Sequence, residues 1–198
     1  MNEVACFSQR DARWASELLG TGDLSIGTAG CLLTCMASVL VDFGVPTDPH
    51  RLNQWLISRG GYKQGNLFVF DSVGGLGANL DRYVNCEKVP APVSILNEAL
   101  KAGCSAVIEV DYQPGGALNR HWVRLIALQE FGGWIMDPWE TPGRETVSLG
   151  DYLARGWNAS RGIFALSLYS HNGERVLSFS YVDSAGAAVQ EHLAVRVA

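Results

Sequence analysis

The stretch that decides the fold is GTAGCLLTCMASVLVDF, residues 27–43. A glycine-containing loop leads here into an apolar segment with the periodicity of a helix. Its apolar positions follow the spacing i, i+4, i+7 and i+11, at Leu32, Met36, Val39 and Phe43. Gly44 and Pro46 come directly afterwards, and such residues commonly end helices. The sequence therefore predicts a core helix that begins at Cys31 and ends before Gly44.

The chemistry of this segment depends on Cys31. A cysteine at the start of a helix lies in the field of the unpaired N–H groups and the helix dipole, which stabilises a thiolate. Gly30 has no side chain to block a substrate, and the N–H of Cys31 could donate to an oxyanion. A small thiol that merely begins a core helix explains the segment equally well. Both interpretations stay open on this stretch alone.

The other cysteines have weaker settings. Cys35, one turn later, flanks the apolar stripe inside the helix, so we expect a core thiol. Cys6, Cys86 and Cys104 lack a comparable setting. Five cysteines are an odd number without a CxxC pair, which favours free thiols in a reducing compartment over disulfides or a zinc site. The sequence thus predicts neither a metal nor a cofactor.

Caps and periodicity predict further helices and strands. Asp48 is an N-cap with Pro49 at the first helical position, and Gly60-Gly61 ends that helix. Pro92 begins another helix, which Gly103 closes. The remaining expectations are a long ordered loop over residues 1–30, short helices at 69–76 and 149–154, and strands at 105–112, 121–129, 134–137 and 163–169.

The C-terminal residues differ in character. Asn172-Gly173 favours a type I′ hairpin between strands at 164–169 and 175–182. A second turn at 184–187 leads into a strand over 189–197. Because helices come first and strands follow, the pattern predicts an α+β fold. We expect one domain over residues 1–168, with residues 169–198 as an antiparallel strand extension of that domain.

Composition and charge narrow the range of partners. The chain has 198 residues, of which 47% are hydrophobic and 18% charged, as in an ordinary globular domain. Fifteen Lys and Arg stand against twenty Asp and Glu, and no basic run stands out. Neither nucleic-acid binding nor membrane insertion is therefore expected. The N-terminus lacks the pattern of a signal peptide, so we expect a cytoplasmic protein, or one released by lysis.

Two polar residues later in the chain complement Cys31. His121 opens a strongly apolar strand, and Asp137 ends the next strand because Pro138 cannot continue a central ladder. Singly, such a histidine is usually structural, and an Asp-Pro pair is a common turn. Together, the three residues match the nucleophile, base and orienting carboxylate of a Cys–His–Asp triad.

With these residues the chain resembles the papain-like cysteine peptidases, and within them the C39-like peptidase family. The resemblance rests on Ser8-Gln9, Gly30-Cys31, His121-Trp122-Val123 and Asp137-Pro138. It implies a papain-like fold, with N-terminal helices packed on an antiparallel sheet and a C-terminal hairpin added. It also implies a peptidase of bacterial or phage origin that acts on peptide or protein substrates, with Gln9 as an oxyanion donor beside the N–H of Cys31.

Two other functions fit the same residues. The triad could cleave amide bonds in peptidoglycan, as an amidase or endopeptidase of phage or bacterial origin. Alternatively, the chain could be a catalytically silent papain-like binding module. The oligomeric state stays open, although exposed C-terminal strands could form a subunit contact.

The pairing of His121 with Asp137 depends on a hairpin register that the sequence leaves open. A tight turn at Gly132-Gly133 would place Asp137 opposite Leu128, far from His121. The triad therefore requires either a longer loop, at about residues 129–133, or a bulge that shifts the register.

Overall fold

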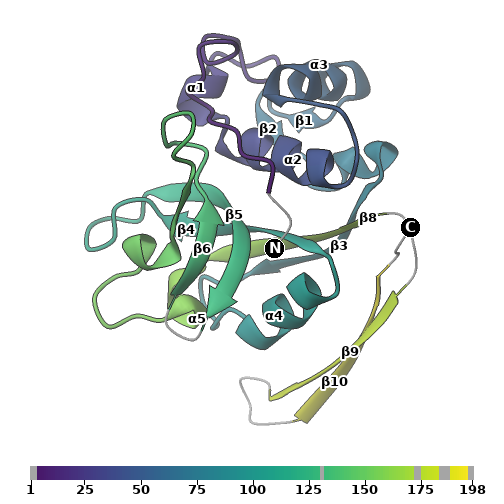
Figure 1. Ribbon diagram of the computed structural model, residues 1–198, viewed down its shortest axis with the longest axis vertical. Coiled ribbons are helices and arrows are strands. Elements are labelled where there is room, and N and C mark those ends of the chain that lie inside the picture. Colours follow the sequence, from purple (N-terminus) through teal and green to yellow (C-terminus); the bar gives the residue numbers. More distant parts are fainter. Residues whose placement is uncertain (1–3, 130–131, 172–174, 183–187, 196–198) are drawn as a thin grey trace.

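The computed structural model describes residues 4–129, 132–171, 175–182 and 188–195, with side chains up to residue 171. At its centre is a six-stranded antiparallel sheet in the order β3-β8-β4-β5-β6-β7 (Figure 1). The strands are β3 Ala78–Asn85, β4 Ser105–Asp111, β5 Arg120–Gln129, β6 Gly132–Met136, β7 Thr146–Ser148 and β8 Ala165–His171. Helices followed by an antiparallel sheet make this an α+β fold, as predicted.

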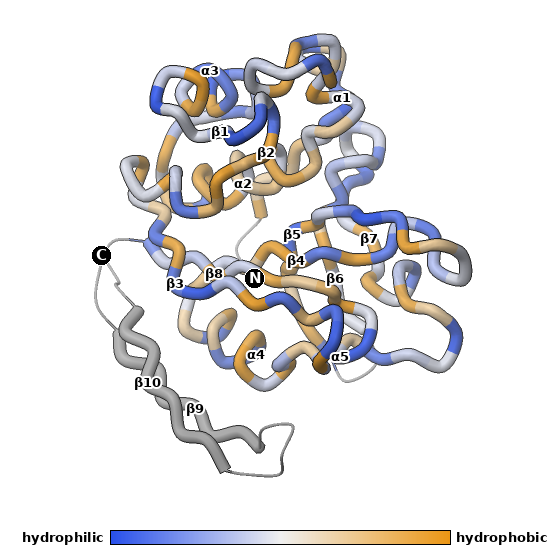
Figure 2. The backbone as a smooth tube through the Cα atoms, turned by 180° about the vertical axis from the view of Figure 1, so that it is seen from behind, coloured by the Kyte–Doolittle hydropathy of each residue, from blue (hydrophilic) through white to orange (hydrophobic). Residues whose placement is uncertain are grey.

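Helices cover both faces of the sheet. α2 (Cys31–Asp42) packs on one face and α4 (Val93–Lys101) on the other, above and below the sheet in Figure 1. Val107 of β4 belongs to the core with α2, whereas its neighbour Ile108 belongs to the core with α4. Successive strand residues point to opposite faces, so β4 is buried along its whole length. Figure 2 shows the same pattern as hydrophobic colour along α2 and the central strands.

The three longer helices confirm their predictions. α2 ends at Asp42, and Gly44 follows with the positive φ of 82° that glycine tolerates best. α3 (Pro49–Arg59) packs against α2 and begins at the predicted cap, where the Asp48 side chain accepts the N–H of Arg51. Gly60 ends α3 in the left-handed conformation.

Several short elements differ from the expectations. The N-terminal loop contains the single-turn helix α1 (Ile26–Ala29), and the two short predicted helices are the 3-10 helices η1 (Ser72–Leu76) and η2 (Leu149–Tyr152). Pattern reasoning missed β1 Tyr62–Lys63, β2 Leu67–Phe68, β3, β7 and α5 Ala159–Gly162. β3 is an edge strand of mixed polarity, so it lacks the alternation of a half-buried strand.

Strand β6 begins earlier in the sequence than the strongest turn signal indicated. Gln129 pairs with Gly132, so Gly132-Gly133, which carried the strongest turn signal, lies within β6. A β-bulge between Leu125 and Ala127 then shifts the register by one residue. The triad required either a longer loop or a bulge, and the β5–β6 hairpin contains the bulge.

This shifted register places Asp137 near His121. The last pair of the hairpin is Arg124 with Met136. Continued by one residue, the register brings Asp137 level with Val123, which shares a sheet face with His121 two residues away. Diagonal neighbours of this kind are within reach of each other's side chains.

The C-terminal strands form a separate two-stranded sheet. β9 (Arg175–Val182) pairs with β10 (Ala188–Val195), while β8 pairs with β3 and β4. The expected pairing of β9 with the preceding strand is therefore wrong. Both predicted turns, at residues 172–173 and 184–187, lie outside the described residues. Within the described ranges, no helix has the length and apolar character needed to cross a bilayer.

Candidate active site

Cys31 is the first residue of α2, so its backbone N–H has no acceptor within the helix. Its side chain is half-buried. Gly30 joins α1 to α2 where space is short: a Cβ would lie 2.5 Å from the carbonyl oxygen of Ile26 and 2.7 Å from its Cγ2. The glycine is thus needed because the Ile26 backbone comes close, a reason different from the expected access of substrate. This tight junction between α1 and α2 fixes the position of Cys31 at the start of α2.

The imidazole of His121 links Cys31 to Asp137. Its Nε2 lies 2.5 Å from Asp137 Oδ1, and the side chain of Cys31 lies close enough to the ring to raise the pKa of His121. Because Asp137 occupies Nε2, the ring nitrogen left for Cys31 is Nδ1. His121 is 6% exposed and Asp137 is fully buried. The structure therefore brings together the three residues that the sequence singled out.

The pKa values reflect this proximity. Burial alone would lower the pKa of His121, but the hydrogen bonds with Asp137 and Cys31 and their negative charges raise it to about 9. Burial would likewise raise the pKa of Asp137, but the hydrogen bond and positive charge of His121 hold it below its usual value. The geometry thus favours a protonated imidazole beside an ionised carboxylate.

Aromatic residues that the sequence did not single out surround this pair. The Tyr152 hydroxyl of η2 donates to Asp137 Oδ2, and the backbone N–H of Trp139 donates to Oδ1 at 2.8 Å. The Tyr112 ring meets His121 edge-on at 5.4 Å between centroids, and the Tyr152 ring stacks on it at 6.4 Å. Single tyrosines form no motif, so the sequence carried no signal for either residue.

Gln9 lies behind the turn that precedes Cys31. Its Nε2 donates to the carbonyl oxygens of Gly27, at 3.0 Å, and Ile26, at 3.4 Å. Its backbone N–H donates to the carbonyl of Pro138 at 2.7 Å. Gln9 thus ties α1 to the segment that follows Asp137, and its Oε1 is buried without a partner among the described residues. Its role as an oxyanion donor stays a prediction.

Cys35 has the features of a core thiol. It is fully buried, and its Sγ lies 3.5 Å from the carbonyl oxygen of Trp122. Burial, and then the negative charges of Cys31 and Asp137, raise its pKa well above the usual value. Such a thiol is a poor nucleophile.

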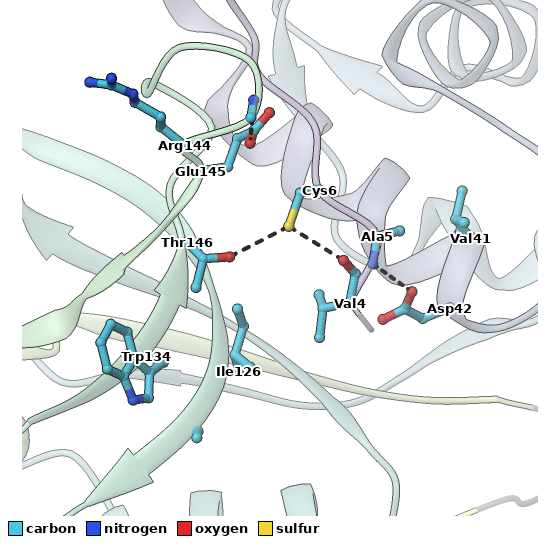
Figure 3. A pocket seen from close by; sticks show the side chains of 12 residues that line it. Val4, Ala5, Cys6, Val41, Asp42, Ile126, Trp134, Arg144, Glu145 and Thr146 are labelled. Atoms are coloured by element: carbon cyan, nitrogen blue, oxygen red, sulfur yellow. Dashed lines mark hydrogen bonds between the residues drawn. The ribbon is translucent and has the colours of Figure 1, made fainter. Parts of the chain in front are cut away.

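Cys6 lines a larger cavity at the other end of α2 (Figure 3). This open cavity of about 1010 Å³ lies between the N-terminal segment, Asp42 and the strands β6 and β7. The length of α2 places Asp42 about 16 Å from Cys31. Cys6 Sγ lies 3.7 Å from Thr146 Oγ1, and burial raises the pKa of the thiol. Among the described residues that line the cavity there is no histidine to act as the base that a thiol nucleophile requires.

A smaller pocket opens directly beside Cys31. It has a volume of about 150 Å³ and is lined mainly by apolar and aromatic side chains. These include Leu19, Leu32, Tyr62, Leu67, Phe68 and Trp122. Leu67 at the pocket is 54% exposed. The pocket contains no charged side chain among its described lining, so it is suited to an apolar group.

Within the described part of the chain, no group of three or more His, Cys, Asp or Glu side chains is placed to hold a metal ion.

Comparison with known proteins gives a structural neighbour. A protein from Bacillus anthracis described as a "putative C39-like peptidase" superposes with a TM-score of 0.50 at 16% sequence identity. The match covers 85% of this chain and 95% of the other. No protein-family model matches the sequence, and no curated protein matches it. The neighbour shows that the two chains share a fold of helices and an antiparallel sheet.

Proposed function

We propose that this chain is a cysteine peptidase, with Cys31 as nucleophile, His121 as base and Asp137 orienting that base. One observation carries the proposal: Asp137 occupies Nε2 of His121 at 2.5 Å, which leaves the other ring nitrogen for the thiol at the start of α2. The fold shared with a protein described as a C39-like peptidase supports the same class of enzyme.

The first half of the reaction is acylation of Cys31. His121 takes the thiol proton, and the helix N-terminus stabilises the resulting thiolate. The sulfur attacks the carbonyl carbon, and the C=O electrons move to the oxygen. The N–H of Cys31 and, if its amide turns, Gln9 donate to that oxyanion. When the intermediate collapses, the C–N bond breaks and the amine leaves with the proton of His121.

The second half is hydrolysis of the thioester. His121, now neutral, takes a proton from water as the water oxygen attacks the acyl carbon. The C–S bond then breaks, the acid product leaves, and the sulfur regains its thiolate form beside the imidazolium. Asp137 stays ionised throughout and holds the ring in one orientation.

The pocket beside Cys31 indicates the substrate. An apolar side chain of a peptide would lose its hydration against Leu19, Phe68 and Trp122, which favours binding. A charged side chain would find no partner there and is disfavoured. We therefore expect cleavage near apolar residues.

Cleavage of a mixed peptide library tests this function. Wild type should cut peptides beside apolar residues, and Cys31→Ala should cut none of them. Leu67→Asp puts a carboxylate at the exposed edge of the pocket and should raise KM for apolar peptides roughly tenfold. Val89→Asp is the matched control, because Val89 is also exposed and does not line the pocket.

The same preparations separate the alternative functions. Clearing of cell-wall suspensions by wild type but not by Cys31→Ala, without peptide cleavage, would identify a peptidoglycan hydrolase. Binding of peptides without turnover by either protein would identify a silent binding module and would overturn the proposal.

A further inference from the structure

The Asp137 carboxylate accepts three hydrogen bonds. His121 and the backbone N–H of Trp139 both donate to Oδ1, and the Tyr152 hydroxyl donates to Oδ2. Among the described residues, Tyr152 alone donates a hydrogen bond to Oδ2. Rotation of the carboxylate about its Cβ–Cγ bond moves both oxygens together, so the Tyr152 bond resists this rotation from the side opposite the two bonds to Oδ1.

Packing alone does not explain a tyrosine at this position. The Tyr152 ring lies in the core beneath the sheet and stacks on His121, which a phenylalanine ring could do equally well. The hydroxyl is different, since it reaches a fully buried carboxylate oxygen. Without it, that oxygen would be left buried and unpaired.

We propose that Tyr152 is a positioning residue of the active site, whose hydroxyl holds the Asp137 carboxylate so that Oδ1 faces His121 Nε2. The inference rests on the proposed peptidase function, because it assigns Tyr152 a role in the same Cys31–His121–Asp137 site. Tyr152 acts through Asp137 and does not itself take part in bond making.

The protonation states suit this role. Burial and the nearby Asp137 carboxylate raise the pKa of Tyr152, so the phenol stays a neutral donor wherever the thiolate is reactive. Its hydrogen bond in turn helps to hold the pKa of Asp137 low. The other titratable groups near the pair are His121 of β5, Tyr112 after β4, Cys31 and Cys35 of α2, and Glu140 after β6.

Tyr152→Phe in the full chain tests the inference. The variant keeps the ring and removes the hydroxyl, so kcat should fall roughly tenfold while KM stays unchanged. Asp137 should then protonate at higher pH, because one of the bonds that lower its pKa is gone. The pH dependence of Cys31 alkylation has an acid limb, the low-pH range in which the rate falls as the site protonates. This acid limb should therefore move to higher pH. Tyr169→Phe removes another buried hydroxyl, bonded to the carbonyl of Phe70, and should leave that limb in place.

Two further measurements keep the test decisive. In the Asp137→Ala background, Tyr152→Phe should add little further loss, because a residue that acts through the Asp137 carboxylate has lost its target. If Tyr152→Phe does not fold, site-specific 3-fluorotyrosine keeps the ring and supplies a more acidic donor, so the acid limb should move to lower pH. An unchanged acid limb in both replacements would overturn the inference. Absence of a reactive Cys31 thiolate in wild type would instead overturn the proposed function itself.

Discussion

Asp137 Oδ1 lies 2.5 Å from His121 Nε2, although Asp137 follows the last paired residue of β6. The bulge between Leu125 and Ala127 makes this contact possible. Without its one-residue shift, Asp137 would lie level with Arg124, and its side chain would point to the sheet face opposite His121. With the shift, Asp137 and His121 share a face. A local irregularity of one residue thus determines whether the site can form.

Replacing Asp137 should lower both activity and the pKa of His121. Asp137→Ala removes the hydrogen bond and the charge that raise this pKa, while the burial that lowers it remains. NMR titration should therefore place the pKa of His121 well below 9, and kcat should fall about 100-fold. Asp137→Asn keeps one acceptor oxygen and should lose less activity. A His121 pKa that stays near 9 in Asp137→Ala would contradict the account.

Stability should fall as the pH rises through the pKa of His121. The folded-state pKa of about 9 lies above the ordinary value of 6.5, so the protonated ring stabilises the fold. This contribution is fully present below about pH 6.5 and is lost as the pH rises through about 9, with a size of about 3 kcal/mol. Urea unfolding of wild type and His121→Gln at successive pH values measures it. Parallel stability curves for the two proteins would argue against the raised pKa.

Gln9→Ala should separate oxyanion stabilisation from thiolate formation. If Gln9 donates to the oxyanion, its loss should reduce kcat by about 100-fold, as for other single donors. Alkylation of Cys31 passes through no oxyanion, so its rate should change little. A variant that cleaves peptides at the wild-type rate would exclude Gln9 from the oxyanion site.

Gly30→Ala should distort the start of α2. Its Cβ would meet the carbonyl oxygen of Ile26 at 2.5 Å, so the α1–α2 junction must move, at a cost of about 1–3 kcal/mol. We expect lower stability together with slower alkylation of Cys31. Gly116→Ala is the control, because a Cβ there meets nothing within 4 Å. Equal stability of the two variants would show that the junction can relax.

Sequence reasoning recovered the elements with strong local signals. The helix beginning at Cys31 has an apolar stripe, and the helix beginning at Pro49 has the Asp48 cap. The central strand β4 is buried along its whole length because helices cover both sheet faces. The helix beginning at Cys31 and the apolar strand β5 present Cys31 and His121, which explains why both residues could be singled out.

The missing features depend on contacts between distant segments. The bulge after Leu125 has no signature in the residues themselves, and the turn signal at Gly132-Gly133 lies inside strand β6. Tyr152 reaches Asp137 only because η2 packs against β6. Gln9 approaches α1 only through tertiary packing. Periodicity and caps describe local structure, so they could not predict these contacts.

The rate of alkylation of each cysteine at mildly acidic pH tests the central claim most directly. Iodoacetamide at about pH 5, followed by mass spectrometry of the digested chain, reports every thiol separately. A Cys31 thiolate held by His121 should react far faster than Cys35, and His121→Gln should abolish that advantage. Selective labelling of Cys31 that depends on His121 is the result we predict. Equally slow labelling of Cys31 and Cys35, or faster labelling of Cys35, would contradict the assignment of Cys31 as the nucleophile.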